Sequence, residues 1–573
     1  MGILLTNLRA AAREIAIFAF YAGLSIALTW PLASELPTAV ADRGDPLLNA
    51  WIIDWVCHAL THDPLHLFDA PIFHPARFPL ALSEHMTGIA LPLIPFHFAG
   101  LGAVTVYNIG ILLSFALSGY GAFVLARLVT RDVVASLIAG VFYAFVSFKF
   151  DHLSHLQIIA GGWIPLTLAA LLLFWRTGSA KHAALFAAAF AMNGLSNVYW
   201  LLFTSIAVAI TIAFLEVAGH PFNRKRLALA LAGAAIVLLP FLVPYQVVAK
   251  SYRMQRTSIE SRAASATWSD WFTASPASLI YGRQGAGQME RHLFPGVLPL
   301  ILALAGAAAV MRGGVPIGQE WAGRGRLLIP AAIVLAMAGC VLVPWHKSDV
   351  PFTLAVVCGL AALPWKKMEN PEPWVAAIWV AIGFIGSFGE NSFLHPFLFR
   401  VLEPFRATRA PARWAIIAYC GLAVLAAIGA SRLGRLRFAL LLVAIVEVIP
   451  RFTWNHVPPE FPPVYHWLAR ARPSCAIELP IAWNETEAYY VLASTVHRVP
   501  IMNGVSGFDP PLHQTLLHHS YDDAMLDLIA RNGATVVIVH PAAAKNVRSW
   551  VDRGALTELV RFPDGDTVYA ISR

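Results

Sequence analysis

The first 450 residues alternate between long apolar blocks and short polar segments. The blocks run for about 16 to 20 residues without Asp, Glu, Lys or Arg, which is the length of helix that crosses the hydrocarbon core of a bilayer. They predict an α-helical polytopic membrane protein with about thirteen transmembrane helices. We place these helices near residues 15–33, 104–126, 133–147, 159–175, 182–194, 199–217, 227–247, 293–311, 327–343, 352–364, 373–388, 414–430 and 438–450.

The pattern changes after residue 450. Residues 474–480, 534–540 and 567–571 are short apolar runs typical of buried strands, and residues 522–532 have helical spacing. Strand, helix and strand in succession predict a small α/β domain. The chain therefore divides into a transmembrane domain, residues 1–450, and a water-soluble domain, residues 451–573.

Composition supports the membrane assignment. Hydrophobic residues make up 58% of the chain and charged residues 13%, and a soluble chain would carry roughly twice that charged fraction. The formal net charge of +8 does not indicate a nucleic-acid partner, because the basic residues form short clusters between the apolar blocks. We interpret these clusters as orientation signals.

The basic clusters also predict which side of the membrane each loop occupies. With a retained first helix and a cytoplasmic N-terminus, the clusters fall on one face. An odd number of crossings then places the C-terminal domain on the exterior side. Four exterior segments are too long to be simple turns: residues 34–103, 248–292, 389–413 and the tail from 451.

Asp42 and Asp45 open the first exterior segment, directly after the first predicted helix. Asp45 lies in a Gly-Asp-Pro turn that leads into an amphipathic helix, so its carboxylate is held close to the membrane surface. A carboxylate at this place suits a general base that acts on a membrane-linked substrate. The alternative is that Asp45 only caps the helix that follows it.

The layout resembles the GT-C class of integral-membrane glycosyltransferases. Residues 44–51, Gly-Asp-Pro-Leu-Leu-Asn-Ala-Trp, and 83–85, Ser-Glu-His, also resemble a bacterial branch of that class related to the YfhO-type membrane proteins. The resemblance implies an inverting enzyme of the bacterial inner membrane that takes a sugar from a polyprenyl-phosphate donor. The acceptor is a cell-surface glycan or lipid, and the C-terminal domain is periplasmic.

The same resemblance implies roles for the early acidic residues. In that class the acidic residue of the first exterior loop serves as general base or helps to hold a divalent metal, and this role falls on Asp45, with Asp42 as the second candidate. Arg43 and Gly44 separate the two carboxylates, so a strict D-x-D spacing is missing and a metal is not supported.

Arginines supply candidate ligands for the donor phosphate. Arg406, Arg409 and Arg413 stand before a predicted helix on the exterior side, where the orientation rule disfavours basic residues, and phosphate binding explains them. Arg253 belongs to a second cluster in another exterior loop. The alternative is a non-specific contact with anionic headgroups.

Polar residues at the same exterior face are candidate substrate ligands: Glu84, His85, His152, His155, Gln157, Asn197 and Tyr199. The histidines lack the paired spacing of a zinc site, so hydrogen bonds to sugar or phosphate are expected in place of metal binding. For each of them a structural role at the interface is the alternative, and Asn197 would then satisfy backbone groups at a helix break.

Two other classes of function remain open: a transporter or flippase for lipid-linked sugars, and a non-catalytic assembly factor. Transporters usually need ionisable residues within the bilayer, and the predicted helix centres contain almost none, with Glu447 as the main exception. Because the charged and histidine residues gather at one face, the pattern favours chemistry at that surface.

Overall fold

The described structure is mostly helical. This computed structural model describes residues 2–254, 257–282, 288–312, 370–483 and 485–572, with a few isolated positions between 335 and 358. Seven helical stretches are long and apolar enough to cross a membrane, which confirms the prediction of a polytopic helical protein. They are Ala11–Leu28, Ala103–Thr130, Val133–Asp151, Leu156–Thr177, Val198–Val217, Arg224–Ser251 and Pro411–Ser431.

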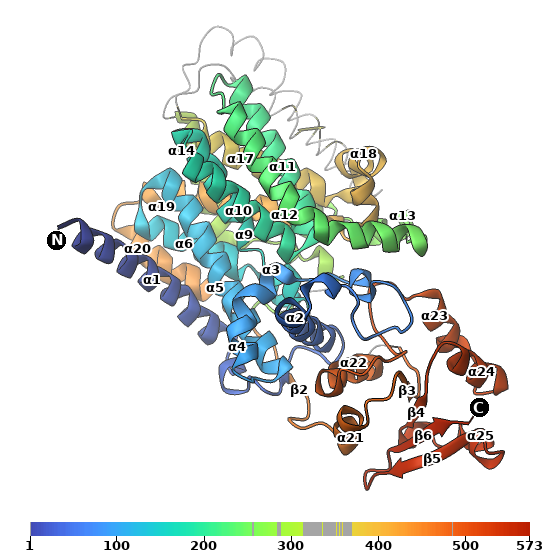
Figure 1. Cartoon of the computed structure of the whole chain (residues 1–573). Coiled ribbons are helices and arrows are strands. Elements are labelled where there is room, and N and C mark those ends of the chain that lie inside the picture. Colours follow the sequence, from blue (N-terminus) through green and yellow to red (C-terminus); the bar gives the residue numbers. More distant parts are fainter. Residues whose placement is uncertain are drawn as a thin grey trace.

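The helices of the membrane part pack together into one bundle (Figure 1). They are α1 (Gly2–Leu28), α5 (Ala103–Thr130), α6 (Val133–Phe145), α7 (Ser147–Asp151), α8 (Leu156–Ile159), α9 (Trp163–Thr177), α10 (Ala180–Ser196), α11 (Val198–Val217), α12 (Arg224–Ser251), α13 (Ser258–Ala263), α14 (Val297–Arg312), α17 (Glu372–Ser387), α18 (Leu394–Val401), α19 (Ala415–Ser431) and α20 (Leu436–Glu447). The spans predicted near 327–343 and 352–364 lie outside the described residues, so the total of about thirteen stays a prediction.

Helix α19 lies at the centre of the bundle. It packs against α5, α6, α14 and α17, and 89% of its membrane window is buried. Small residues permit this packing. A Cβ atom on Gly306 of α14 would lie 2.0 Å from the Leu425 carbonyl oxygen of α19, and one on Gly429 of α19 would lie 2.1 Å from the Leu302 carbonyl oxygen of α14. The two backbones therefore touch, as small residues allow where helices meet in a membrane.

The first long segment, residues 34–103, contains α2 (Asp45–His62), α3 (Thr87–Ala90) and α4 (Ile94–Phe98). Gly44 is the N-cap of α2 and Pro46 lies in its first turn, where the missing N–H of proline costs nothing. Most of α2 is buried, because it lies between the bundle and the C-terminal part of the chain. Apart from its two end residues, Asp45 and His62, α2 is therefore a packed element.

The C-terminal part forms a separate lobe beside α2 (Figure 1). Its four-stranded sheet has the order β3-β4-β6-β5, in which β3 and β4 are parallel and the other pairs antiparallel. The predicted strands and helix coincide with β3, β4, β6 and α24, whereas β5 and the other helices were not predicted. The elements are β3 (Ala476–Leu479), β4 (Val536–Val539), β5 (Leu556–Arg561), β6 (Thr567–Ile571), α21 (Pro463–Ala471), α22 (Glu485–His497), α23 (Pro511–His518), α24 (Asp523–Arg531) and α25 (Arg548–Asp552).

A buried polar cluster lies at the ends of β3 and β4. His540 follows β4, and its Nδ1 lies 2.8 Å from Asp566 and its Nε2 3.1 Å from Glu478. Burial lowers the pKa of His540, but these two carboxylates outweigh it and raise the pKa to about 9. The imidazolium therefore joins β3, β4 and the turn before β6.

The first long segment is docked on the C-terminal lobe. Strand β1 (Ala39–Val40) pairs with β2 (Asn455–His456), and α2 packs on α22. The Trp51 indole N–H donates to Ser494 at 2.9 Å, and Asp54 forms an ion pair with Arg498. Residues 71–74 exchange backbone hydrogen bonds with residues 501–503, beside the edge strand β3. The two segments therefore lie on the same side of the bundle.

Candidate functional site

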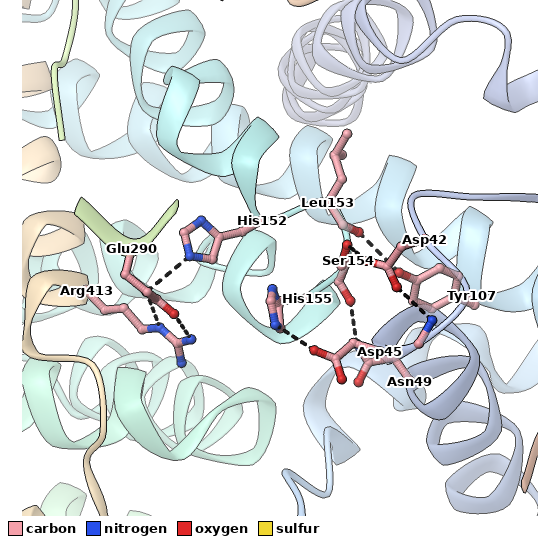
Figure 2. Close-up of polar contacts among 11 residues, drawn as sticks. Asp42, Asp45, Asn49, Tyr107, His152, Leu153, Ser154, His155, Glu290 and Arg413 are labelled. Atoms are coloured by element: carbon pink, nitrogen blue, oxygen red, sulfur yellow. Dashed lines mark hydrogen bonds and ion pairs between the residues drawn. The ribbon is translucent and has the colours of Figure 1, made fainter. Parts of the chain in front are cut away.

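Asp45 is the first residue of α2, and its side chain is 51% exposed. The N-cap of α2 is Gly44, so Asp45 lies in the first turn of the helix and is not the capping residue itself. Its carboxylate instead contacts His155, whose Nε2 lies 2.8 Å from Oδ2 (Figure 2). Since α2 also directs its positive end toward this carboxylate, Asp45 is held ionised and open to solvent.

Asp42 has a different surrounding from Asp45. One of its carboxylate oxygens accepts the Gly44 N–H at 2.8 Å, and the other accepts the Ser154 hydroxyl. The Asn49 side chain donates to the carbonyl oxygen of Ser154 at 3.0 Å. Asp42 therefore uses both oxygens to shape the turn and to fix it against the loop between α7 and α8, as Figure 2 shows.

Positive charges face Asp45 from the chain segment before α19. Burial raises the pKa of Asp45, but the hydrogen bond from His155 and the charges of His155, Arg409 and Arg413 outweigh it and lower the pKa below its usual value. Asp45 is consequently a carboxylate at neutral pH. The structure thus brings together Asp45 and two of the three arginines that the sequence singled out in that segment.

Arg413 is buried and paired. Its Nε donates to Glu290 Oε2 at 3.0 Å, and its Nη2 contacts Oε1 of the same carboxylate. Burial raises the pKa of Glu290, but the charges and hydrogen bonds of Arg413 and His152 hold it well below its usual range. Both ring nitrogens of His152 face acceptors, because Nδ1 lies 2.8 Å from the Phe148 carbonyl and Nε2 3.2 Å from Glu290. His152 therefore links Phe148 of α7 to Glu290.

Arg409 is the arginine that stays free. Its backbone N–H donates to the Tyr199 hydroxyl at 2.7 Å, while its exposed guanidinium has no ion pair among the described residues. The Tyr199 ring also lies against Arg413, with the guanidinium carbon 4.9 Å from the ring centroid. Tyr199 therefore fixes the position of both arginines. Arg406, exposed as well, donates to the Phe399 carbonyl at 3.4 Å.

The other predicted ligands lie around this group or apart from it. Glu84 accepts the Val198 N–H at 2.9 Å, and burial raises its pKa to about 7, although that N–H and the charge of Arg413 lower it. His85 is 2% exposed, bonds Thr87 at 2.7 Å, and has its pKa lowered to about 3 by burial. Glu84 thus belongs to the group around Arg413, and His85 is enclosed.

Asn197 and Gln157 hold backbone together. Asn197 accepts the Trp200 N–H at 3.1 Å as the N-cap of α11, and its amide donates to the Gln157 carbonyl at 2.9 Å. This is the structural role that the sequence left as the alternative for Asn197. The Gln157 side-chain oxygen is buried and has no hydrogen-bond partner in the described part of the chain. Arg253 is exposed after the end of α12, at a positive φ of 50°, and none of the contacts around Asp45 includes it.

Three residues of this region escaped the sequence analysis. Glu290 holds Arg413, Ser154 holds Asp42, and Asp151 accepts from Ser275 at 2.5 Å and pairs with His292 at 2.7 Å. Only Asp151 carried a signal, because it directly precedes His152. In the part of the chain that the structure describes, no group of three His, Cys, Asp or Glu side chains could hold a metal ion.

Comparison with known proteins gives only distant resemblances. No protein-family model and no curated protein matches the chain. Among solved structures, the archaeal oligosaccharyltransferase AglB from Archaeoglobus fulgidus, in complex with an inhibitory peptide and a dolichol-phosphate, is 14% identical with a TM-score of 0.44. The match covers 98% of this chain and 74% of AglB.

A second solved structure, ArnT from Cupriavidus metallidurans bound to undecaprenyl phosphate, is 14% identical with a TM-score of 0.39. The match covers 96% of this chain and 97% of ArnT. At these values neither structure is close enough to support a conclusion about the chemistry of this chain.

Proposed function

We propose that this protein is a membrane glycosyltransferase of the GT-C class that transfers a sugar from a polyprenyl-phosphate donor to a hydroxyl group of a glycan or lipid acceptor. The observation that carries the proposal is an ionised, half-exposed Asp45 carboxylate that faces the charges of Arg409 and Arg413. A base and a phosphate-binding cation on one surface are what a direct displacement at an anomeric carbon requires.

In the proposed reaction, the acceptor oxygen forms a bond to the anomeric carbon while its proton passes to Asp45. The bond between that carbon and the phosphate oxygen breaks, and its electron pair leaves with the lipid phosphate. Arg409, whose guanidinium has no ion pair with the described residues, binds the departing phosphate directly. Because a single displacement proceeds from the opposite face of the sugar, the configuration at the anomeric carbon is inverted.

His155 and Glu290 are positioning residues in this scheme. His155 fixes the Asp45 carboxylate from one side and leaves its other oxygen for the acceptor. Glu290 holds the Arg413 side chain through Nε and Nη2, and no described hydrogen bond uses Nη1. Arg413 thus adds a fixed positive charge to the exposed guanidinium of Arg409.

The test compares Asp45→Asn with Asp42→Asn in the full-length protein. Asn keeps the shape and most hydrogen bonds of Asp but is not a base, so Asp45→Asn should lose about a hundredfold or more in turnover while it still binds polyprenyl phosphate. In Asp42→Asn the amide oxygen can still accept the Gly44 N–H, and the amide N–H can donate to the Ser154 hydroxyl oxygen, so the turnover should stay near that of the unchanged protein. Turnover is measured with a panel of polyprenyl-phosphate sugars and isolated membrane acceptors.

Two results would contradict parts of the proposal. If Asp42→Asn were inactive and Asp45→Asn active, the base assignment would be wrong while the class of enzyme survived. If both variants kept full activity, neither carboxylate would be the general base, and the proposal would lose the observation that carries it.

A further inference from the structure

An open cavity of about 450 Å³ lies between α1, α5, α9 and α10. Its floor is apolar and includes Phe123, Leu166 and Leu173. Its arginines lie near the C-terminal ends of α5 and α9, and Glu14 of α1 is the other charged residue of its lining. Tyr107, near the start of α5, lies beside Asp45, and Arg127 is 20 residues further on, so the cavity rim is about 30 Å from the Asp45 site.

Two of the charged residues on the rim are already neutralised. Arg176 forms an ion pair with Glu372 at 2.8 Å, and Glu14 forms one with Arg13 at 2.9 Å. These side chains therefore have little demand for a further counter-charge.

Arg127 and Arg131 lack such a counter-charge. Arg127 donates to the backbone carbonyl of Arg131, and neither guanidinium contacts a carboxylate among the described residues. The two residues are four positions apart across the end of α5, and both line the cavity. The rim therefore carries two uncompensated positive charges directly above an apolar floor.

We propose that this cavity binds a two-chain anionic glycerophospholipid. One acyl chain would lie on the apolar floor, and the phosphate would accept hydrogen bonds from Arg127 and Arg131. The lining belongs largely to α5 and α9, whose stretches are apolar enough to cross a membrane, so hydrocarbon is the expected filling. A zwitterionic headgroup would leave part of the positive charge uncompensated.

Basic residues at helix ends also occur as orientation signals alone, and the experiment must distinguish the two. Arg432 and Arg435 provide the matched control, because they are exposed basic residues in the connection between α19 and α20 and do not line the cavity. The proposal does not depend on glycosyl transfer, so its outcome and that of the Asp45 test are separate.

The full-length protein is purified in a neutral detergent and incubated with equal amounts of phosphatidylglycerol and phosphatidylcholine. Retained lipid is counted by native mass spectrometry. The unchanged protein should retain phosphatidylglycerol preferentially, and Arg127→Gln with Arg131→Gln should reduce that retention about tenfold or more. Arg432→Gln with Arg435→Gln should leave it unchanged.

The single variant Arg131→Gln serves as a milder test, because this side chain is exposed and forms no ion pair with the described residues. It should lose part of the preference while its melting temperature stays the same. Equal retention of the two lipids by the unchanged protein would overturn the proposal. Equal loss in the control variant, or displacement of phosphatidylglycerol by undecaprenyl phosphate in competition, would overturn it as well.

Discussion

The ion pair between Glu290 and Arg413 joins two nearly buried charges. The side chains are 12% and 7% exposed, and the pair is bidentate, with Nε 3.0 Å from Oε2. In Glu290→Gln the Arg413 guanidinium stays buried but loses the carboxylate that balances its charge. Loss of one partner of a buried pair costs about 3–5 kcal/mol. Because the Gln oxygen can still accept one hydrogen bond, we expect the lower end, about 3 kcal/mol.

Arg413→Gln should be less costly than Glu290→Gln, because the Glu290 carboxylate keeps the His152 ring as a hydrogen-bond partner at 3.2 Å. In the double variant the two amides can bond each other, and neither leaves a charge behind. Its cost should therefore fall short of the sum of the two single costs by about 2 kcal/mol.

The free energies of unfolding are measured by detergent titration of the purified full-length protein in mixed micelles. Arg291→Gln is the control, because Arg291 pairs with Asp270 at 2.8 Å but is 32% exposed, so its loss should cost about 1 kcal/mol or less. Strict additivity in the double variant would show that the pair is not coupled. A Glu290→Gln variant as stable as Arg291→Gln would refute the argument from burial.

Three further predictions concern the donor, the lobe and the orientation of the chain. Arg409→Gln should weaken polyprenyl-phosphate binding by about 1.5–3 kcal/mol, whereas Arg406→Gln should not change it; equal affinity of both variants in a lipid-binding titration would contradict this. Burial lowers the pKa of His540, but two carboxylates outweigh it and raise the pKa from 6.5 to about 9. The stability that the charge of His540 contributes is therefore fully present below pH 6.5 and is lost as the pH rises toward 9. Melting temperatures of the full chain, measured between pH 6.5 and 9, should show this decline, and His540→Gln should make them less dependent on pH. The same pH dependence in His540→Gln would show that the charge of His540 does not contribute to stability. Single cysteines in place of Leu65 and Lys545, both exposed, should be labelled by an impermeant reagent from the same, non-cytoplasmic side, and opposite accessibility would overturn the topology.

The local sequence pattern predicted those parts of the fold that depend on residues close together in the chain. Apolar length located the seven long helices of the described residues, because crossing a bilayer requires it, and short apolar runs located three of the four strands of the sheet in the lobe. The Gly44-Asp45-Pro46 turn was predicted for the same reason. His152 and His155 were candidates because they stand together at a helix end.

Distant pairing could not be predicted in this way. Glu290 and Arg413 are 123 positions apart, and nothing in the sequence around Glu290 distinguishes it from a solvated loop residue. Arg406, Arg409 and Arg413 looked equivalent in sequence, but their surroundings differ. Arg413 is buried and paired with Glu290, Arg409 is exposed and its charge acts on Asp45, and Arg406 donates to the Phe399 carbonyl of α18. The strand β1 has two residues, which is too short for any pattern.

The pairing of β1 with β2 has a consequence for the order of biosynthesis. The Asn455 side chain bonds the carbonyl of Ala41, 414 positions earlier. At about 5–20 residues per second, the ribosome supplies that partner about 20 to 80 s after the first loop is made. During this time the segment that leads into Asp45 has neither its strand partner nor the lobe beneath α2. A nascent chain can thus fill the membrane with helices long before the Asp45 surface takes its final form.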